Sequence, residues 1–116
     1  MTTIYGIPNC STVKKARQWL ADQAIDATFH DFKKQGVPGP ALAEWVQKAG
    51  LDTVLNRKGT TWRGLSDSDK AQADTPQGAL ALLSANPSLI KRPVLEHKGQ
   101  LLIGFDESRY REVFDR

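Results

Sequence analysis

The chain has few of the residues that form covalent cross-links and metal sites. It contains one cysteine, Cys10, among 116 residues, so an internal disulfide cannot form. Its two histidines, His30 and His97, are far apart in the sequence and give no recognisable zinc-ligand spacing, so we expect both to be strand or turn residues. These shortages exclude a disulfide scaffold and argue against a zinc module.

Long apolar segments and blocks of like charge are also missing. The first ten residues lack the apolar run of a secretory signal, and no later stretch approaches the roughly twenty apolar residues of a membrane span. We therefore expect a cytoplasmic protein that does not bind membranes. Sixteen Lys and Arg against thirteen Asp and Glu give a formal charge of +3. This mild excess favours anionic ligands, but without a basic block a nucleic-acid partner is not expected.

The N-terminal third predicts a strand, a helix and a second strand. Residues 2–5 are rich in β-branched and aromatic side chains and precede a turn. Val13, Ala16 and Leu20 then recur at helical spacing, and residues 27–32 alternate loosely between polar and apolar. This order of elements indicates a βαβ unit, with parallel strands and a right-handed crossover.

The middle of the chain predicts helices, and the C-terminal part predicts a hairpin and a last helix. Residues 33–40, KKQGVPGP, form a turn-rich connector, after which we expect two or three helices, the first at residues 41–49. Residues 94–97 and 100–103 read as two strands joined by a Lys98-Gly99 turn. Asp106 can cap the final helix.

Together these elements predict an α/β protein with a thioredoxin-like fold, in which helices flank a four-stranded mixed sheet. We expect a single domain over residues 1–116. Its core comprises residues 1–35 and 90–116, and residues 36–89 form an inserted helical subdomain.

Cys10 is the candidate nucleophile because it lies where the first strand ends and the first helix begins. Unpaired N–H groups and the helix dipole stabilise a thiolate there. Lowering a thiol pKa from about 8.5 to about 6 raises the thiolate fraction at pH 7 from about 3% to about 90%, and requires about 3.4 kcal/mol. A helix terminus contributes at most about 2 kcal/mol, so a cation must help. The alternative is that Cys10 is a buried, inert small residue.

The residues that follow Cys10 limit its chemistry. Cys10-Ser11-Thr12-Val13 has no second thiol at the spacing of a dithiol motif, so any catalytic disulfide must be made with another molecule and opened by an external thiol. Lys14 and Lys15 lie one helical turn further on. Both are also explained as the solvated face of an amphipathic helix, the interpretation that we prefer for Lys15.

Three stretches, YGIPNCSTVKKA, NPSLIKRPVL and LLIGFDESRYREVF, carry a resemblance to a known family. With these motifs in this order, the chain resembles the arsenate reductase (ArsC) and Spx family, and within it the YffB-like branch. Members are thioredoxin-like proteins with an inserted helical subdomain. The resemblance spans essentially the whole chain.

The resemblance implies that Cys10 is the redox or nucleophilic residue, and that Arg57 and Arg92 bind oxyanions beside it. It also implies a cis Arg92–Pro93 bond, next to which an extended peptide such as glutathione could pair. The alternative for both arginines is a plain surface cation. We predict a monothiol, glutathione-dependent thiol-disulfide oxidoreductase, with glutathione as co-substrate and no bound cofactor. The residues predicted to bind substrate or glutathione are Asn9, Ser11, Thr12, Lys14, Arg57, Arg92 and Pro93.

Three departures from the family weaken the other functions that it suggests. The chain has Gly6 where arsenate reductase carries a histidine, and Gly104 where it carries a third anion-binding arginine. It also lacks the two-cysteine switch of the Spx regulators. Arsenate reduction, and Spx-like binding to RNA polymerase without catalysis, therefore stand as alternatives.

Overall fold

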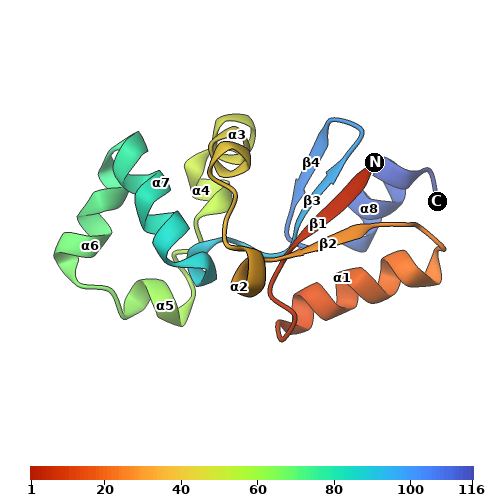
Figure 1. Ribbon diagram of the computed structural model, residues 1–116, viewed down its shortest axis with the longest axis horizontal. Helices are drawn as coiled ribbons and strands as arrows, with labels where there is room; N and C mark the ends of the chain where they lie inside the picture. The colour runs from red at the N-terminus through yellow and green to blue at the C-terminus, as the bar shows by residue number, and fades with distance from the viewer. The chain divides into compact units, whose positions relative to one another are not determined.

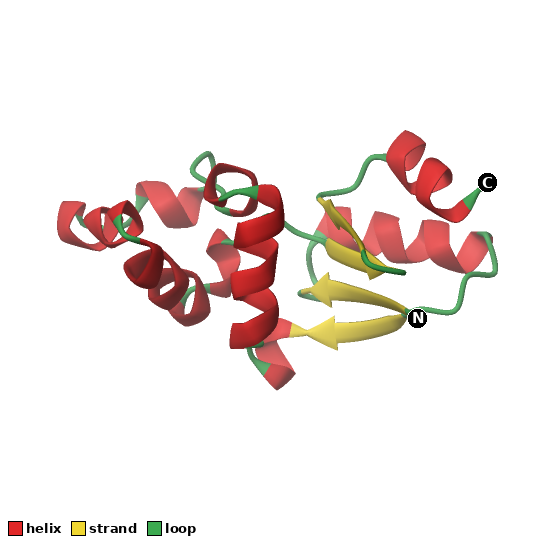
Figure 2. Cartoon of the chain, turned by 90° about the horizontal axis from the view of Figure 1, so that it is seen from above, coloured by secondary structure: helices red, strands yellow, loops and turns green.

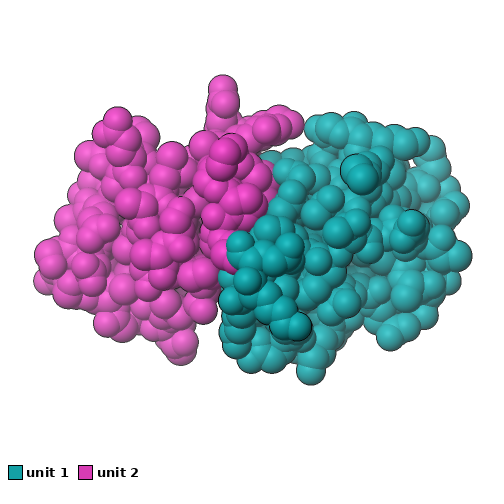
Figure 3. All heavy atoms as spheres, viewed as in Figure 1, with its two compact units in different colours: residues 1–35, 92–116 teal, residues 36–91 magenta.

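The computed structural model describes all 116 residues, which divide into two compact units (Figure 3). Unit 1 comprises residues 1–35 and 92–116, and unit 2 comprises residues 36–91. Unit 1 contains the sheet, whereas unit 2 is helical. None of the helices is both long and apolar enough to cross a membrane.

Unit 1 is built on a four-stranded mixed sheet, which confirms the predicted fold class. The strands are β1 (Thr2–Gly6), β2 (Thr28–Asp31), β3 (Val94–His97) and β4 (Gln100–Ile103), and their order is β2-β1-β3-β4. The pair β1 and β2 is parallel, and both β1 with β3 and β3 with β4 are antiparallel. Figure 2 shows the strands side by side. Short helix α2 (Phe32–Gln35) follows β2 directly.

One face of the sheet is covered by α1 (Ser11–Asp22) and α8 (Glu107–Phe114) (Figure 1). Helix α1 buries the apolar stripe that its sequence spacing predicts, together with Trp19. The rings of Trp19 and Tyr110 meet edge to face, with their centroids 5.6 Å apart. Burying each large side chain in this way contributes about 1.5–3 kcal/mol. The core cluster contains Ile4, Ala16, Trp19, Leu20, Leu95, Leu102 and Tyr110.

Local turn and cap chemistry explains where the C-terminal elements begin and end. Lys98 and Gly99 both have positive φ, at 49° and 79°, which is the backbone that a two-residue hairpin turn requires. Asp106 is the N-cap of α8 and accepts a hydrogen bond of 3.0 Å from the Ser108 N–H. The predicted hairpin and capped helix are therefore confirmed.

Unit 2 contains five α-helices and two short 3-10 turns, more pieces than the two or three helices expected. The reason is that glycines interrupt the segment: Gly50 ends the first helix with φ 87°, and Gly59 and Gly64 flank a helix of four residues. The elements are α3 (Gly39–Ala49), α4 (Leu51–Val54), α5 (Thr60–Arg63), α6 (Asp67–Ala71), η1 (Gln72–Asp74), α7 (Pro76–Ala85) and η2 (Pro87–Leu89).

Unit 2 ends at Lys91, because backbone hydrogen bonds bind its last residues to α4 and the residues just after it. The Lys91 N–H donates to the Val54 carbonyl at 2.8 Å, and Leu55 pairs with Ile90 in an isolated antiparallel bridge. Ile90 and Lys91 therefore belong to unit 2, and unit 1 resumes at Arg92.

Candidate active site

Cys10 is the N-cap of α1, directly after the turn that leaves β1. Its backbone is extended, with φ −86° and ψ 127°, and its N–H donates to the Ile7 carbonyl at 3.3 Å. Its own carbonyl accepts the first helical hydrogen bond, at 2.9 Å from the Lys14 N–H. The residue is partly exposed. Cys10 is thus neither fully buried nor fully exposed, and reactive cysteines lie in such partly exposed places.

Opposing influences act on the pKa of Cys10, and their sum lowers it. Burial raises the pKa of the thiol, but the Val13 N–H, the Arg92 side chain and the Thr12 N–H together outweigh burial. Thr12 and Val13 are the second and third residues of α1, where backbone N–H groups have no helical partner and face the N-cap side chain. The Cys10 side chain forms no N-cap hydrogen bond of normal geometry, but these two N–H groups still lower the pKa of the thiol.

A helix terminus alone does not stabilise the thiolate enough, and Arg92 supplies the positive charge that is also needed. It acts on Cys10 both as a hydrogen-bond donor and as a positive charge. Arg92 lies just before β3, whose residue Val94 is paired with Tyr5 near the end of β1. Strand pairing therefore brings together two side chains that are far apart in the sequence.

The Arg92–Pro93 peptide bond is cis, as the resemblance implied. Pro93 is buried, and its carbonyl accepts a 2.8 Å hydrogen bond from the Gly104 N–H. The residue before β3 is thus fixed against the segment after β4.

The other predicted binding residues in unit 1 differ in their exposure and in their contacts with Cys10. Thr12 is half-buried and presents its N–H to the sulfur. Asn9 lies exposed in the turn before Cys10, and Ser11 is the exposed first residue of α1. The Lys14 side chain is also exposed, and its link to Cys10 is the backbone hydrogen bond to the carbonyl.

Arg57 belongs to unit 2, and its contacts there are well defined. Its guanidinium forms an ion pair with Asp52 and lies 5.5 Å from the centre of the Trp62 ring. The Lys70 ammonium lies 5.9 Å from the same ring. Arg57, Trp62 and Lys70 line a pocket of about 320 Å³. A role for Arg57 as a ligand of the anion at Cys10 stays a prediction.

Unpaired N–H groups were expected to stabilise the thiolate at the start of the helix, but Val13 was not among the predicted site residues, because its side chain is that of a core residue and is fully buried. The signal that could have revealed it is positional. When a cysteine is the N-cap, the N–H groups two and three residues later face its sulfur whatever side chains they carry.

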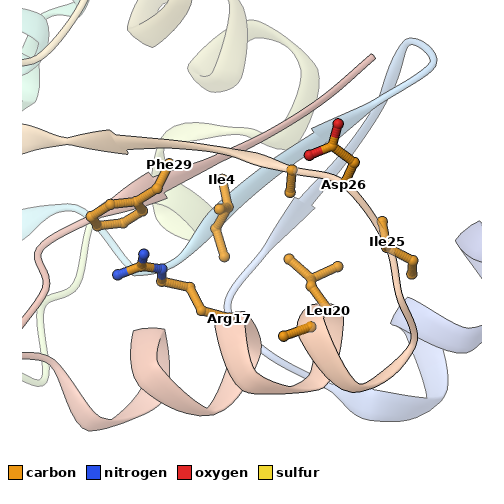
Figure 4. Close-up of a pocket in the computed structure, with 8 residues that line it drawn as sticks. Ile4, Arg17, Leu20, Ile25, Asp26 and Phe29 are labelled. Atoms are coloured by element: carbon orange, nitrogen blue, oxygen red, sulfur yellow. The ribbon is translucent and has the colours of Figure 1, made fainter.

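Unit 1 has a cavity of its own, which lies between α1 and β2 and does not include Cys10 (Figure 4). Its volume is about 210 Å³, and its lining is mostly apolar. The Arg17 guanidinium lies 4.0 Å from the centre of the Phe29 ring at one side of it. With no nucleophile and only Arg17 and Asp26 charged, this cavity offers no alternative reaction centre.

The molecule is thioredoxin-like: a four-stranded mixed sheet is followed, after its first strand, by a helix that starts at the chain's one cysteine, and an arginine and a cis-proline precede β3. The sequence model of the ArsC family matches residues 5–113. The chain belongs to the ArsC family.

Relatives of known sequence or structure agree with this assignment. The solved structure of the YffB protein is 43% identical, with a TM-score of 0.91, and the match covers 97% of this chain and 98% of the other. An arsenate reductase (ArsC) related protein from Brucella melitensis is 44% identical, with a TM-score of 0.74 over 99% and 95% of the two chains. An uncharacterized protein of Haemophilus influenzae is 43% identical over 98% of this chain and 99% of its own.

Proposed function

We propose that the protein is a monothiol, glutathione-dependent thiol-disulfide oxidoreductase that acts in the cytoplasm. The observation that carries the proposal is the set of groups around the only cysteine. The N–H groups of Val13 and Thr12 and the Arg92 guanidinium all favour the thiolate of Cys10 over its thiol. A thiolate is the attacking species in disulfide exchange.

The proposed reaction has two exchange steps. The Cys10 thiolate attacks one sulfur of a disulfide R–S–S–R′, which forms a Cys10–S–S–R bond and releases R′–S⁻. A glutathione thiolate then attacks the R sulfur of this mixed disulfide. That step forms a glutathione–S–S–R disulfide and releases Cys10 as thiolate. The lowered pKa of Cys10 assists the second step, because a thiol of low pKa is a better leaving group.

Glutathione suits the charge and the backbone of this site. It is an extended peptide with two carboxylates, and a guanidinium such as that of Arg92 binds carboxylates through paired hydrogen bonds. Asn9, Ser11 and Thr12 are neighbours of Cys10 in the chain and none of them is buried, so they would offer polar groups to the peptide. Arg57 would bind a second carboxylate in this proposal.

The proposal is tested by incubating the protein with oxidised glutathione and measuring its intact mass. We expect a single glutathione adduct that maps to Cys10 and is removed by reduced glutathione. The Cys10→Ser variant should form none. A native protein that stays unmodified under these conditions would contradict the proposal.

Arsenate reduction is the second candidate, because a relative that is 44% identical is an arsenate reductase related protein. The site argues against it. Gly104 has φ 81°, a backbone that side chains rarely adopt, and a Cβ at Gly6 would meet Val13, so neither position suits the longer residues of the arsenate enzyme. We expect glutathione exchange without arsenate-dependent turnover.

If the protein were only a binding module, Cys10→Ser would keep its cellular phenotype, whereas an enzyme would lose it.

A further inference from the structure

The end of β1 and the first turn of α1 approach each other so closely that a side chain does not fit between them. A Cβ atom placed on Gly6 would lie 2.8 Å from Cγ2 of Val13 and 3.4 Å from its Cγ1. Gly6 is the last residue of β1, it is buried, and it is paired with Asp31 of β2. Val13 is fully buried as well. A methyl group at residue 6 must therefore displace the valine or the strand.

The backbone of Val13 matters because its N–H acts on the Cys10 sulfur. Only three residues separate Gly6 from the N-cap, so the chain cannot absorb a displacement far from the thiol. The Lys14 N–H fixes the Cys10 carbonyl in the same helical turn. A shift of Val13 away from β1 would thus change the placement of its N–H relative to the sulfur.

We propose that Gly6 is a positioning residue for the reacting thiol, and that its missing side chain lets Val13 pack against the end of β1 and so aims the Val13 N–H at the Cys10 sulfur. The inference rests on the proposed function in that Cys10 is the reacting group. It does not depend on glutathione. The one charged side chain that acts on the thiol, Arg92, is left unchanged by substitutions at residues 6 and 13.

The test compares the pH dependence of Cys10 alkylation by iodoacetamide in the native protein, three variants at residues 6 and 13, and one control variant. We expect Gly6→Ala to shift the midpoint of alkylation upward by about half a pH unit, which is about a threefold loss of thiolate below the midpoint. Val13→Ala keeps the N–H and removes the two methyl groups, so its midpoint should stay near that of the native protein. In Gly6→Ala with Val13→Ala the clash is relieved, and the midpoint should return to that of Val13→Ala.

Gly39→Ala is the matched control, because a Cβ there meets nothing within 4 Å; its midpoint should not move. A folded Gly6→Ala variant with the native midpoint would overturn the inference, as would a double variant that fails to fold or keeps the raised midpoint. If Gly6→Ala alone does not fold, the double variant decides, since the inference requires it to fold. A native midpoint that is itself that of an ordinary cysteine would instead count against the proposed function.

Discussion

Arg92 is the charged side chain that acts on the Cys10 thiol, both as a hydrogen-bond donor and as a positive charge. A guanidinium stays charged at every pH at which the protein is folded, so its effect on the thiol does not vary with pH. The N–H groups of Thr12 and Val13 are equally permanent. The thiolate is therefore favoured by fixed groups rather than by a partner that must itself ionise.

Substitution of Arg92 should raise the pKa of Cys10. Arg92→Ala removes both the donor and the charge, and we expect an upward shift in the midpoint of Cys10 alkylation. Arg92→Lys keeps the charge but loses the planar donor group, so its shift should be smaller. Arg109→Ala is the control, because Arg109 is exposed on α8. Equal midpoints in Arg92→Ala and the native protein would show that the guanidinium does not act on the sulfur.

At the scale of elements, α1 and α8 stabilise unit 1 by packing aromatic rings on one face of the sheet. This packing buries two polar atoms without hydrogen-bond partners, Nε1 of Trp19 and the hydroxyl of Tyr110. Burial also raises the pKa of Tyr110 well above that of an exposed tyrosine, against a small lowering by Arg109. The phenol therefore stays protonated in the folded protein, and its hydroxyl contributes no hydrogen bond in return for its lost hydration.

Tyr110→Phe should leave the protein as stable as before or stabilise it by about 1 kcal/mol, because it removes a buried hydroxyl that has no partner. Tyr5→Phe is the matched comparison, since the Tyr5 hydroxyl donates to Glu96 at 2.6 Å. It should cost about 0.5–1.5 kcal/mol. Urea unfolding measures both. A loss of more than about 1 kcal/mol in Tyr110→Phe would mean that its hydroxyl has a partner.

The elements that the sequence predicts well are those with strong local signals. The apolar spacing in α1, the Lys98-Gly99 turn and the Asp106 cap each depend on neighbouring residues, and all three are found. The sequence did not predict the short helices of unit 2 one by one, because Gly50, Gly59 and Gly64 divide this helical segment. Unit 2 extends to Lys91 through hydrogen bonds to residues far away in the sequence, which local patterns do not describe.

The site shows the same division between local and distant information. The place of Cys10 at the start of a helix follows from the sequence alone. Its proximity to Arg92 depends on the pairing of β1 with β3, and only the family resemblance anticipated it. The expectation that unpaired N–H groups at the helix start stabilise the thiolate named no residue, so Val13 was absent from the predicted site although its N–H lowers the pKa of Cys10.

At the scale of the whole molecule, the ionisation of Cys10 links reactivity to stability. The folded pKa of Cys10 is lowered relative to the unfolded chain, so the thiolate favours the folded state. This contribution is fully present above the unfolded pKa, and it is lost as the pH falls through the folded pKa. Cys10 and Arg92 both belong to unit 1, so this linkage concerns the stability of unit 1.

The free energy of unfolding of the native protein, minus that of Cys10→Ser, should therefore rise with pH between the folded and the unfolded pKa of Cys10. Urea unfolding at a series of pH values measures this difference. The same difference should be measured between Arg92→Ala and the Arg92→Ala, Cys10→Ser double variant. There the free energy difference should rise less with pH. A difference that is constant across the neutral and mildly alkaline range would be inconsistent with a lowered pKa.

The most direct measurement is the ultraviolet titration of the thiolate, taken as the native spectrum minus that of Cys10→Ser. Because the chain has one cysteine, the difference reports Cys10 alone. The account predicts a midpoint clearly below the value of about 8.5 for a free thiol, and a higher midpoint in Arg92→Ala. A native midpoint at or above that of a free thiol would contradict the account.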